Sequence, residues 1–221
     1  MFVHANRSLA AADAVAESIA QAGGKARVLQ ADLGQPDGPE RLWQAFDQAC
    51  LALGLTPHLD IVVNNAGVIE RGPIESVTPE SFDAMVMVNF RAPFFISQLA
   101  LPRLRDQGRL IFLSSMGTRA AYPAMAVYAP TKAALEALTR LLAQQLGPRG
   151  ITVNAVAPGL TTTDMNPVDP NSPAGAAALA TIAQGRLGRP QDIAEVVAFL
   201  ASDAAQWVTA QCIEASGGQR L

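Results

Sequence analysis

The chain has 221 residues; half are hydrophobic and 16% are charged, which is not the composition of a disordered protein. The formal net charge of −3 argues against nucleic acid as a partner, because phosphate backbones attract basic surfaces. No apolar run reaches the roughly 18 residues that a membrane span needs, so no membrane association is predicted. The start resembles no secretory signal, and two distant cysteines make no disulfide framework, so a cytoplasmic location is expected.

Short apolar runs alternate with alanine- and leucine-rich runs along the chain. In chain order we predict a strand at Phe2–His4, a helix at Leu9–Ala22, a strand at Ala26–Gln30, a helix at Pro39–Leu53, a strand at Asp60–Val63, a helix from Pro79, a strand at Leu110–Ser114, a helix from Tyr128 to Gly147, a strand at Thr152–Ala155, a helix at Asp192–Ala201 and a strand at Gln211–Glu214. This alternation is typical of a doubly wound, three-layer α/β fold with a parallel, Rossmann-like sheet. The segment Thr161–Gly185 breaks the pattern and is typical of a functional loop.

Tyr128 and Lys132 stand four residues apart on a predicted helix and so share one of its faces. A phenol titrates near pH 10, and a neighbouring ammonium lowers that value, so the pair suits acid–base work on a carbonyl or an alcohol. The spacing alone is common in helices. Taken by itself, it favours an ordinary half-buried tyrosine beside a solvated lysine.

Small and polar residues follow three of the predicted strands. Ser115 ends the strand Leu110–Ser114, Asn64-Asn65-Ala66-Gly67 follows Ile61-Val62-Val63, and Pro158-Gly159 follows the strand that ends near Ala157. Each of these segments would also serve as an ordinary turn or cap. Because ligands of doubly wound sheets bind at the carboxyl ends of the strands, the three segments and the Tyr128/Lys132 pair point to one crevice.

Together these residues resemble the classical short-chain dehydrogenase/reductase family, and the resemblance covers essentially the whole chain. The matching segments are Asn64-Asn65-Ala66-Gly67, Asn89 within Val88-Asn89-Phe90, Ser115, Tyr128-Ala129-Pro130-Thr131-Lys132, Ile151 to Gly159, Ala198 to Asp203, and Ser216-Gly217-Gly218. Within this family, the sequence looks most similar to the 3-oxoacyl-carrier-protein reductase type.

The resemblance implies a catalytic group of four residues. Tyr128 would exchange a proton with the substrate oxygen, and Lys132 would lower the pKa of the phenol and bind the nicotinamide ribose. Ser115 would orient the substrate carbonyl, and Asn89 would hold a water in a proton relay that reaches Lys132. Hydride would pass between the nicotinamide and the carbonyl carbon.

The same resemblance implies a set of cofactor-binding positions. Besides Tyr128 and Lys132 these are Arg7, Asp32, Leu33, Asn65, Ala66, Gly67, Pro158, Gly159, Thr161 and Thr163. Asp32-Leu33 would contact the adenine, and at Thr161 a backbone contact is expected rather than a side-chain one. An arginine after the first strand, in Asn6-Arg7-Ser8, suits a 2′-phosphate and predicts NADP(H) over NAD(H). The plain alternative for Arg7 is a solvated side chain in the first turn of a helix.

The sequence departs from the family at its start. Family members open with a strand, a glycine-rich turn and a helix, and that unit is absent, so Met1-Phe2-Val3 matches their second strand. We therefore expect residues 1–221 to form one N-terminally incomplete domain. Three explanations stay open. The true start of the protein lies upstream, which we favour because every later motif is intact. Otherwise the chain is a truncation that folds poorly or binds no cofactor, or it is a stable relic whose remaining surfaces serve assembly.

Two functions follow. The first is an NADP(H)-dependent oxidoreductase that acts on a small carbonyl or alcohol. A carrier-bound acyl substrate is also possible by resemblance, because Arg149 stands where such enzymes carry a basic residue that docks the carrier protein. Asp106 argues against it, because it stands where a second basic residue would help. The second is a non-catalytic subunit or scaffold of the same fold. Family analogy predicts a homodimer or a homotetramer, and an apolar helix face with Ala133, Ala137 and Leu141 permits such a contact.

Overall fold

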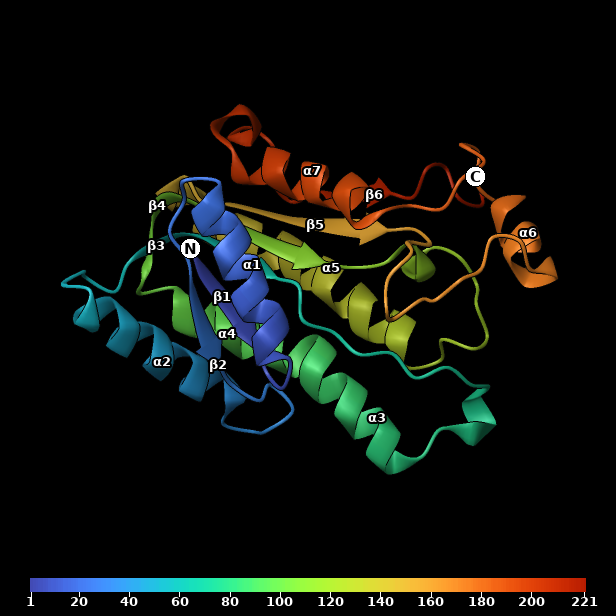
Figure 1. The fold of residues 1–221 in the computed structure, drawn as a ribbon, viewed down its shortest axis with the longest axis horizontal. Coiled ribbons are helices and arrows are strands. Elements are labelled where there is room, and N and C mark those ends of the chain that lie inside the picture. Colours follow the sequence, from blue (N-terminus) through green and yellow to red (C-terminus); the bar gives the residue numbers. More distant parts are fainter.

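The computed structural model describes residues 1–221 and contains six strands, all paired in parallel. They are β1 (Phe2–Ala5), β2 (Arg27–Gln30), β3 (Leu59–Asn64), β4 (Leu104–Leu113), β5 (Thr152–Pro158) and β6 (Cys212–Ala215). The strands form two sheets, one of β1 and β2 and one in the order β3-β4-β5-β6 (Figure 1). The predicted strands are all present, within a few residues of their expected bounds except at the start of β4.

The α-helices confirm the five that the sequence predicted and add two. The observed helices are α1 (Leu9–Gln21), α2 (Gly38–Ala52), α3 (Pro79–Val86), α4 (Ala92–Ala100), α5 (Tyr128–Leu146), α6 (Pro173–Leu179) and α7 (Pro190–Ala201). Thr78 caps α3 as expected, because its side chain accepts a hydrogen bond from the Ser81 N–H. None of these helices combines the length and the apolar character that crossing a bilayer requires.

The larger sheet has helices on both faces, and the paired parts of its central strands β4 and β5 are buried and mostly apolar. On one face Leu110, Phe112 and Val153 pack with α2, α4 and α5 in a core of 19 buried residues. On the other face Ile111, Leu113 and Val156 pack against α7. Side chains alternate between faces along each strand, which is why neighbouring residues of β4 belong to different cores.

The two sheets are not hydrogen-bonded to each other. β1 pairs only with β2, and β3 pairs only with β4, so each has an open edge. Ile61 and Val63 of β3 are 43% and 41% exposed, although their neighbours in β4 are almost fully buried. The sheet is therefore divided between β1 and β3.

Three segments differ from the predicted pattern. β4 begins at Leu104 rather than Leu110, and it is bent where Gln107 adopts a φ of 63°. The helix expected from Pro79 ends at Val86 as α3. A π-helical turn, Met87–Arg91, then leads directly into a further helix, α4. The irregular segment Thr161–Gly185 contains α6, which begins after the cap residue Ser172.

The two-faced core predicts where the chain is most sensitive to truncation of a side chain. Phe112 is fully buried, so Phe112→Ala should lower the free energy of unfolding by about 3–5 kcal/mol in chemical denaturation. Phe82 of α3 is 47% exposed, and Phe82→Ala is the matched control, with an expected loss of about 1 kcal/mol or less. Equal losses for the two variants would contradict this assignment of the core.

Candidate active site

The predicted catalytic residues converge at the carboxyl ends of β3, β4 and β5. Ser115 follows β4 directly and caps the short 3₁₀ turn Met116–Thr118, where its hydroxyl accepts a hydrogen bond from the Gly117 N–H at 3.1 Å. Tyr128 is the first residue of α5, and Lys132 lies one turn further along that helix. Ser115, Tyr128 and Lys132 therefore lie where the end of β4 meets the start of α5.

Tyr128 is half-buried, and burial raises the pKa of its phenol above the ordinary value. A side-chain hydrogen bond with Ser115 and the positive charge of Arg71 act in the opposite direction. The Lys132 ammonium, which the family resemblance predicts to lower this pKa, lies over the Tyr128 ring, 5.7 Å from the centroid; its effect on the phenol stays a prediction. In this geometry the groups that favour the phenolate are Ser115 and Arg71.

Lys132 is 4% exposed, and its ammonium donates a hydrogen bond to the Leu113 carbonyl at 2.8 Å. Burial lowers the pKa of Lys132 to about 8. This contact fixes α5 to the end of β4, the strand that carries Ser115. The lysine thus holds two parts of the site together while titrating near neutral pH.

Asn89 lies in the π-helical turn and is fully buried. Its side-chain oxygen accepts from the Val68 N–H at 2.8 Å, and its side-chain nitrogen donates to the Val68 carbonyl at 2.9 Å. The two bonds fix the loop after β3 beside α5. Gly67 fits there because it lacks a Cβ, which would lie 3.3 Å from Lys132 Nζ and 3.4 Å from Asn89 Oδ1.

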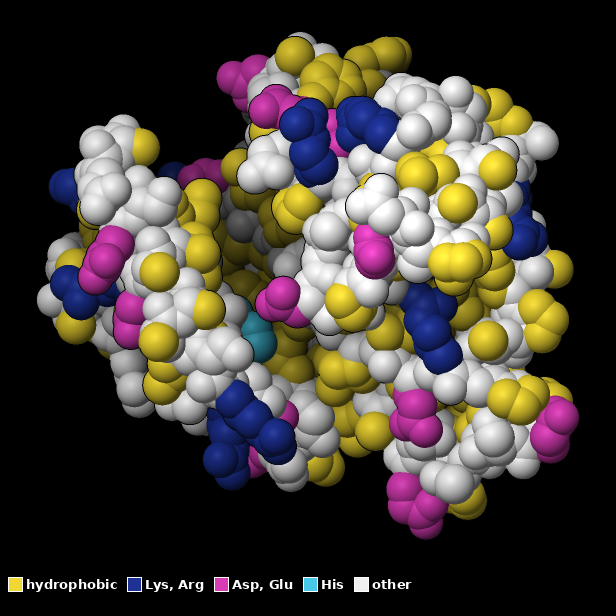
Figure 2. Space-filling view, turned by 45° about the vertical axis from the view of Figure 1, so that its right-hand side comes forward, with side chains coloured by type: hydrophobic (Ala, Val, Ile, Leu, Met, Phe, Trp, Pro, Cys, Tyr) yellow, Lys and Arg dark blue, Asp and Glu magenta, His cyan; other side chains and the backbone are white.

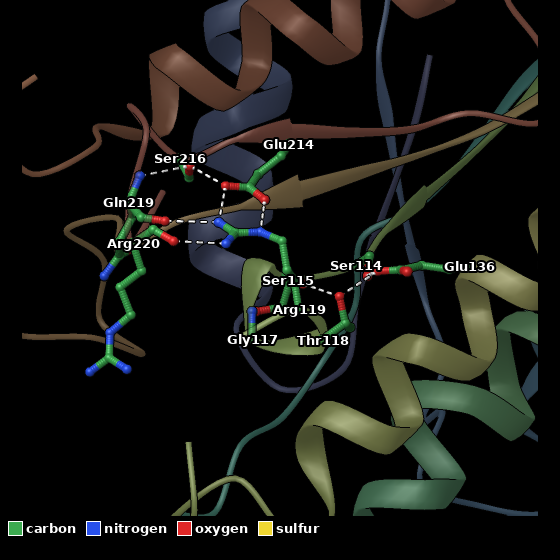
Figure 3. A network of polar contacts seen from close by, with 10 residues as sticks. All are labelled: Ser114, Ser115, Gly117, Thr118, Arg119, Glu136, Glu214, Ser216, Gln219 and Arg220. Atoms are coloured by element: carbon green, nitrogen blue, oxygen red, sulfur yellow. Dashed lines mark hydrogen bonds and ion pairs between the residues drawn. The ribbon is translucent and has the colours of Figure 1, made fainter. Parts of the chain in front are cut away.

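A carboxylate that the sequence did not single out supports the turn after β4. Glu136, one turn beyond Lys132 on α5, accepts hydrogen bonds from the Ser114 hydroxyl at 2.6 Å and the Thr118 hydroxyl at 2.8 Å (Figure 3). These residues flank Ser115 on both sides. Glu136 stands four residues after Lys132, so the sequence places it on the same face of the helix. Its two hydroxyl partners could not be predicted, because they lie 22 and 18 residues earlier in the chain.

The next residue of this turn ties the site to the C-terminal strand. Arg119 makes a bidentate ion pair with Glu214 of β6, both contacts measuring 2.8 Å, and donates to the carbonyls of Gln219 and Arg220 (Figure 3). The hydroxyl of Ser216 donates in turn to Glu214. The network fixes the segment after β6 against the turn that carries Ser115.

The residues predicted to bind the far part of a cofactor lie at the ends of β1 and β2. Asp32 accepts hydrogen bonds from the Asn6 side chain and the Gly34 N–H, both at 2.9 Å, and these contacts together with Arg7 lower its pKa. Leu33 is buried in the larger core, so its side chain is not free to contact adenine. The Arg7 side chain is exposed and makes no hydrogen bond or ion pair within the chain.

The remaining predicted positions follow β3 and β5. After β3, Asn65 is exposed, and Ala66 packs against the larger core. After β5, Thr161 is buried, and its hydroxyl donates a hydrogen bond to the Gly159 carbonyl at 3.0 Å. Thr163 is exposed. Because β5 pairs with β4, the segment from Pro158 onward begins at the same edge of the sheet as Ser115.

Comparison with known proteins agrees with this arrangement. The family model described as enoyl-(acyl carrier protein) reductase matches residues 2–220. The short-chain dehydrogenase/reductase FrzI of Cladobotryum sp. is 41% identical over 214 residues, which cover 94% of this chain and 81% of FrzI. The chain belongs to the short-chain dehydrogenase/reductase family. Membership makes it an oxidoreductase of the dehydrogenase and reductase class.

Two further members of the short-chain dehydrogenase/reductase family illustrate the range of relatives. Versicolorin reductase stcU of Emericella nidulans is 39% identical over 222 residues, covering 94% of this chain and 81% of stcU. The crystal structure of the landomycin C-6 ketoreductase LanV, with bound NADP and rabelomycin, superposes with a TM-score of 0.89 at 43% identity. That match covers 99% of this chain and 84% of LanV. The parallel sheet with its flanking helices is thus the fold of this family.

The buried ammonium predicts a pH-dependent cost to stability. The folded chain binds this proton less tightly than the unfolded chain, because the pKa is about 8 when folded and 10.5 ordinarily. The cost is therefore full below pH 8 and fades as the pH rises from 8 to about 10.5. Lys132→Met should be more stable than wild type at pH 7, by at most about 3 kcal/mol, and this gain should vanish by pH 10.5.

Denaturation at a series of pH values measures this difference. Lys25 is the only other lysine and is exposed, so Lys25→Met is the matched control and should show no pH-dependent gain. A difference between Lys132→Met and wild type that stays constant from pH 7 to 10.5 would rule out a depressed lysine pKa.

Proposed function

We propose that this protein is an NADP(H)-dependent oxidoreductase that transfers hydride between a nicotinamide and a carbonyl or alcohol, with Tyr128 as proton donor and acceptor. The observation that carries the proposal is the meeting of Tyr128, Ser115, Lys132 and Asn89 at one sheet edge. The effect of the Ser115 side chain on the pKa of the Tyr128 phenol supports it, because both hydroxyls would need to face the same substrate oxygen.

The residues present fit the nicotinamide end of the cofactor. Gly67 leaves open the space that a Cβ would fill between Lys132 and Asn89, and this space adjoins Tyr128. At the other end, the unpaired guanidinium of Arg7 is available to a 2′-phosphate. Asn65 to Gly67 and Pro158 to Thr163 would hold the intervening parts through their backbone.

In reduction, the bound cofactor supplies the hydride that reaches the carbonyl carbon. Ser115 would donate a hydrogen bond to the carbonyl oxygen and so favour the negative charge that develops there. The Tyr128 hydroxyl would give its proton to that oxygen. Asn89 would hold the loop that carries Gly67, and with a water it would relay a proton toward Lys132. In the oxidative direction Tyr128 would take the proton from the alcohol.

The selection of NADP(H) and of the substrate class rests on different observations. Arg7 supports NADP(H), and LanV was crystallised with bound NADP. LanV and versicolorin reductase are named as reductases of small molecules, which supports a small carbonyl substrate here. An acyl-carrier substrate has less support, because Arg149 is engaged by Asp106 at 2.8 Å and by the Leu101 carbonyl at 3.0 Å.

The alternative is a non-catalytic subunit of the same fold, and the divided sheet is the observation that favours it. A homodimer or homotetramer fits either function. Ala133, Ala137 and Leu141 are all exposed on α5, and Leu141 is 68% exposed, which supports a contact between copies through this helix. Retention or loss of NADPH binding by residues 1–221 distinguishes the two functions.

Tyr128→Phe tests the proton-transfer role. The variant removes the hydroxyl and keeps the ring, so turnover with NADPH and a ketone should fall by about 10²–10⁴-fold, while the NADPH dissociation constant changes little. The matched control is Tyr122→Phe at the only other tyrosine, which should keep its activity. Turnover of Tyr128→Phe at the wild-type rate would exclude the proposed mechanism.

Arg7→Ala tests the choice of cofactor. Loss of a charge-assisted hydrogen bond should weaken NADPH binding by about tenfold to a hundredfold and leave NADH binding nearly unchanged. Arg27→Ala is the control, because Arg27 is also exposed and unpaired. Arg27 begins β2, whereas Arg7 follows the end of β1, so the two arginines lie at opposite ends of the smaller sheet. Equal losses for NADPH and NADH would remove the argument for a 2′-phosphate.

A further inference from the structure

Arg71 lies where three segments of the chain meet beside the candidate site. It stands in the loop after β3, and the next residue, Gly72, donates a backbone hydrogen bond to the Ala124 carbonyl at 3.1 Å, in the segment that leads into α5. The Arg71 guanidinium donates through Nη2 to the Asn166 side-chain oxygen at 2.6 Å, in the loop after β5. One arginine therefore joins the loops that follow two different strands, close to the start of the helix that carries Tyr128.

The positive charge of Arg71 has no counter-ion in the chain. The loop after β5, from 161 to 185, carries Asp164 and Asp169 but no basic residue, and neither carboxylate forms an ion pair with Arg71. By contrast, Arg119 and Arg186 each donate twice to a carboxylate. Nε and Nη1 of Arg71 make no hydrogen bond within the chain, and the side chain is exposed. The guanidinium thus keeps free donors and an uncompensated charge for a ligand.

This charge reaches the reacting end of the candidate site. Burial raises the pKa of the Tyr128 phenol, while the Ser115 side chain and then the positive charge of Arg71 act to lower it. Arg71 and Val127 also line a common cavity, and Val127 is the residue directly before Tyr128. A group bound by Arg71 would therefore lie within the length of one small molecule from a carbonyl held at Tyr128.

The surface as a whole gives no preference for an anion. The formal net charge is −3, and the space-filling view shows acidic and basic side chains interspersed, with no broad patch of one sign (Figure 2). No general field therefore draws anions to this face, so selection of a charged substrate would depend on a single side chain. Arginine suits that task, because its planar fork of donors matches the two oxygens of a carboxylate.

We propose that Arg71 is a specificity-determining residue that binds a carboxylate of the substrate, so that carbonyl compounds bearing an acid group are preferred over uncharged ones. The inference rests on the proposed function and adds the class of substrate to it. Without substrate, the Asn166 side chain holds the guanidinium between the two loops. With substrate, the carboxylate accepts from the N–H groups that the chain leaves free, and the carbonyl is held toward Ser115 and Tyr128.

Steady-state kinetics with NADPH test the inference on substrates that differ in charge alone, namely formylbenzoates and their methyl esters. Wild type should prefer the acid, measured as the ratio of kcat/KM for the acid to kcat/KM for the ester. Arg71→Gln should lower this ratio by about tenfold, chiefly through KM for the acid, because a charge-assisted contact is lost. Arg71→Lys keeps the charge without the fork and should keep part of the preference.

Two variants of Asn166 separate the charge of Arg71 from its role as a tie between loops. Asn166→Asp keeps an acceptor and adds a counter-ion, so it should lower the acid-to-ester ratio as Arg71→Gln does. Asn166→Ala breaks the tie but leaves the guanidinium uncompensated, so it should keep the wild-type ratio. Arg105→Gln is the matched control. It removes an exposed arginine charge near the start of β4, away from the site, and should keep both the ratio and the rates.

Two results would overturn the inference. One is an acid-to-ester ratio that Arg71→Gln leaves unchanged, and the other is an equal fall of the ratio in Arg71→Gln and Asn166→Ala, which would make Arg71 a tie only. Calorimetric titration of the acids in the presence of NADP⁺ measures binding without turnover. Binding that depends on Arg71 without any turnover would contradict the proposed function, whereas turnover without such binding would contradict the role of Arg71 alone.

Discussion

The hydrogen bond from the Lys132 ammonium to the Leu113 carbonyl is the contact on which the candidate site depends. It joins the first turns of α5, which carry Tyr128, to the end of β4, which carries Ser115. Burying an ammonium costs free energy of desolvation, and the hydrogen bond to the Leu113 carbonyl offsets part of that cost. Asn89 and Glu136 complete this arrangement from opposite sides, one fixing the loop after β3 and the other the turn after β4.

This arrangement explains why the site is rigid without being deeply enclosed. Ser115 and Tyr128 are partly exposed, whereas Lys132 and Asn89 are buried. Side chains that are fixed through buried partners lose little entropy when a substrate arrives, which favours catalysis by orientation. The residues that we propose for the far end of the cofactor differ, because Arg7 and Asn65 are exposed, and they follow β1 of the smaller sheet and the open-edged strand β3.

Much of the fold could be predicted because its elements have strong local signals, such as Thr78 before Pro79 and the apolar run that ends at Ser115. The same signal, Ser172 before Pro173, marks α6, but the surrounding irregular composition concealed it. The membership of Tyr128, Lys132, Ser115 and Asn89 in one site followed from the family resemblance. The upward shift of the Tyr128 pKa did not, because burial and the contributions of Ser115 and Arg71 depend on long-range packing. The bonds of Asn89 to Val68 likewise become visible only in three dimensions.

The Arg119 network has a consequence for the order in which the protein is made. The Arg119 guanidinium donates to the carbonyl of Arg220, 101 residues later in the sequence. Ribosomes release the chain from its N-terminus, so the strand that bears Ser115 is synthesised long before the residues that hold its turn in place. The rim of the site therefore cannot close until the last residues of the chain have been made. Between the synthesis of α5 and that of β6, the turn after β4 is held from the α5 side alone.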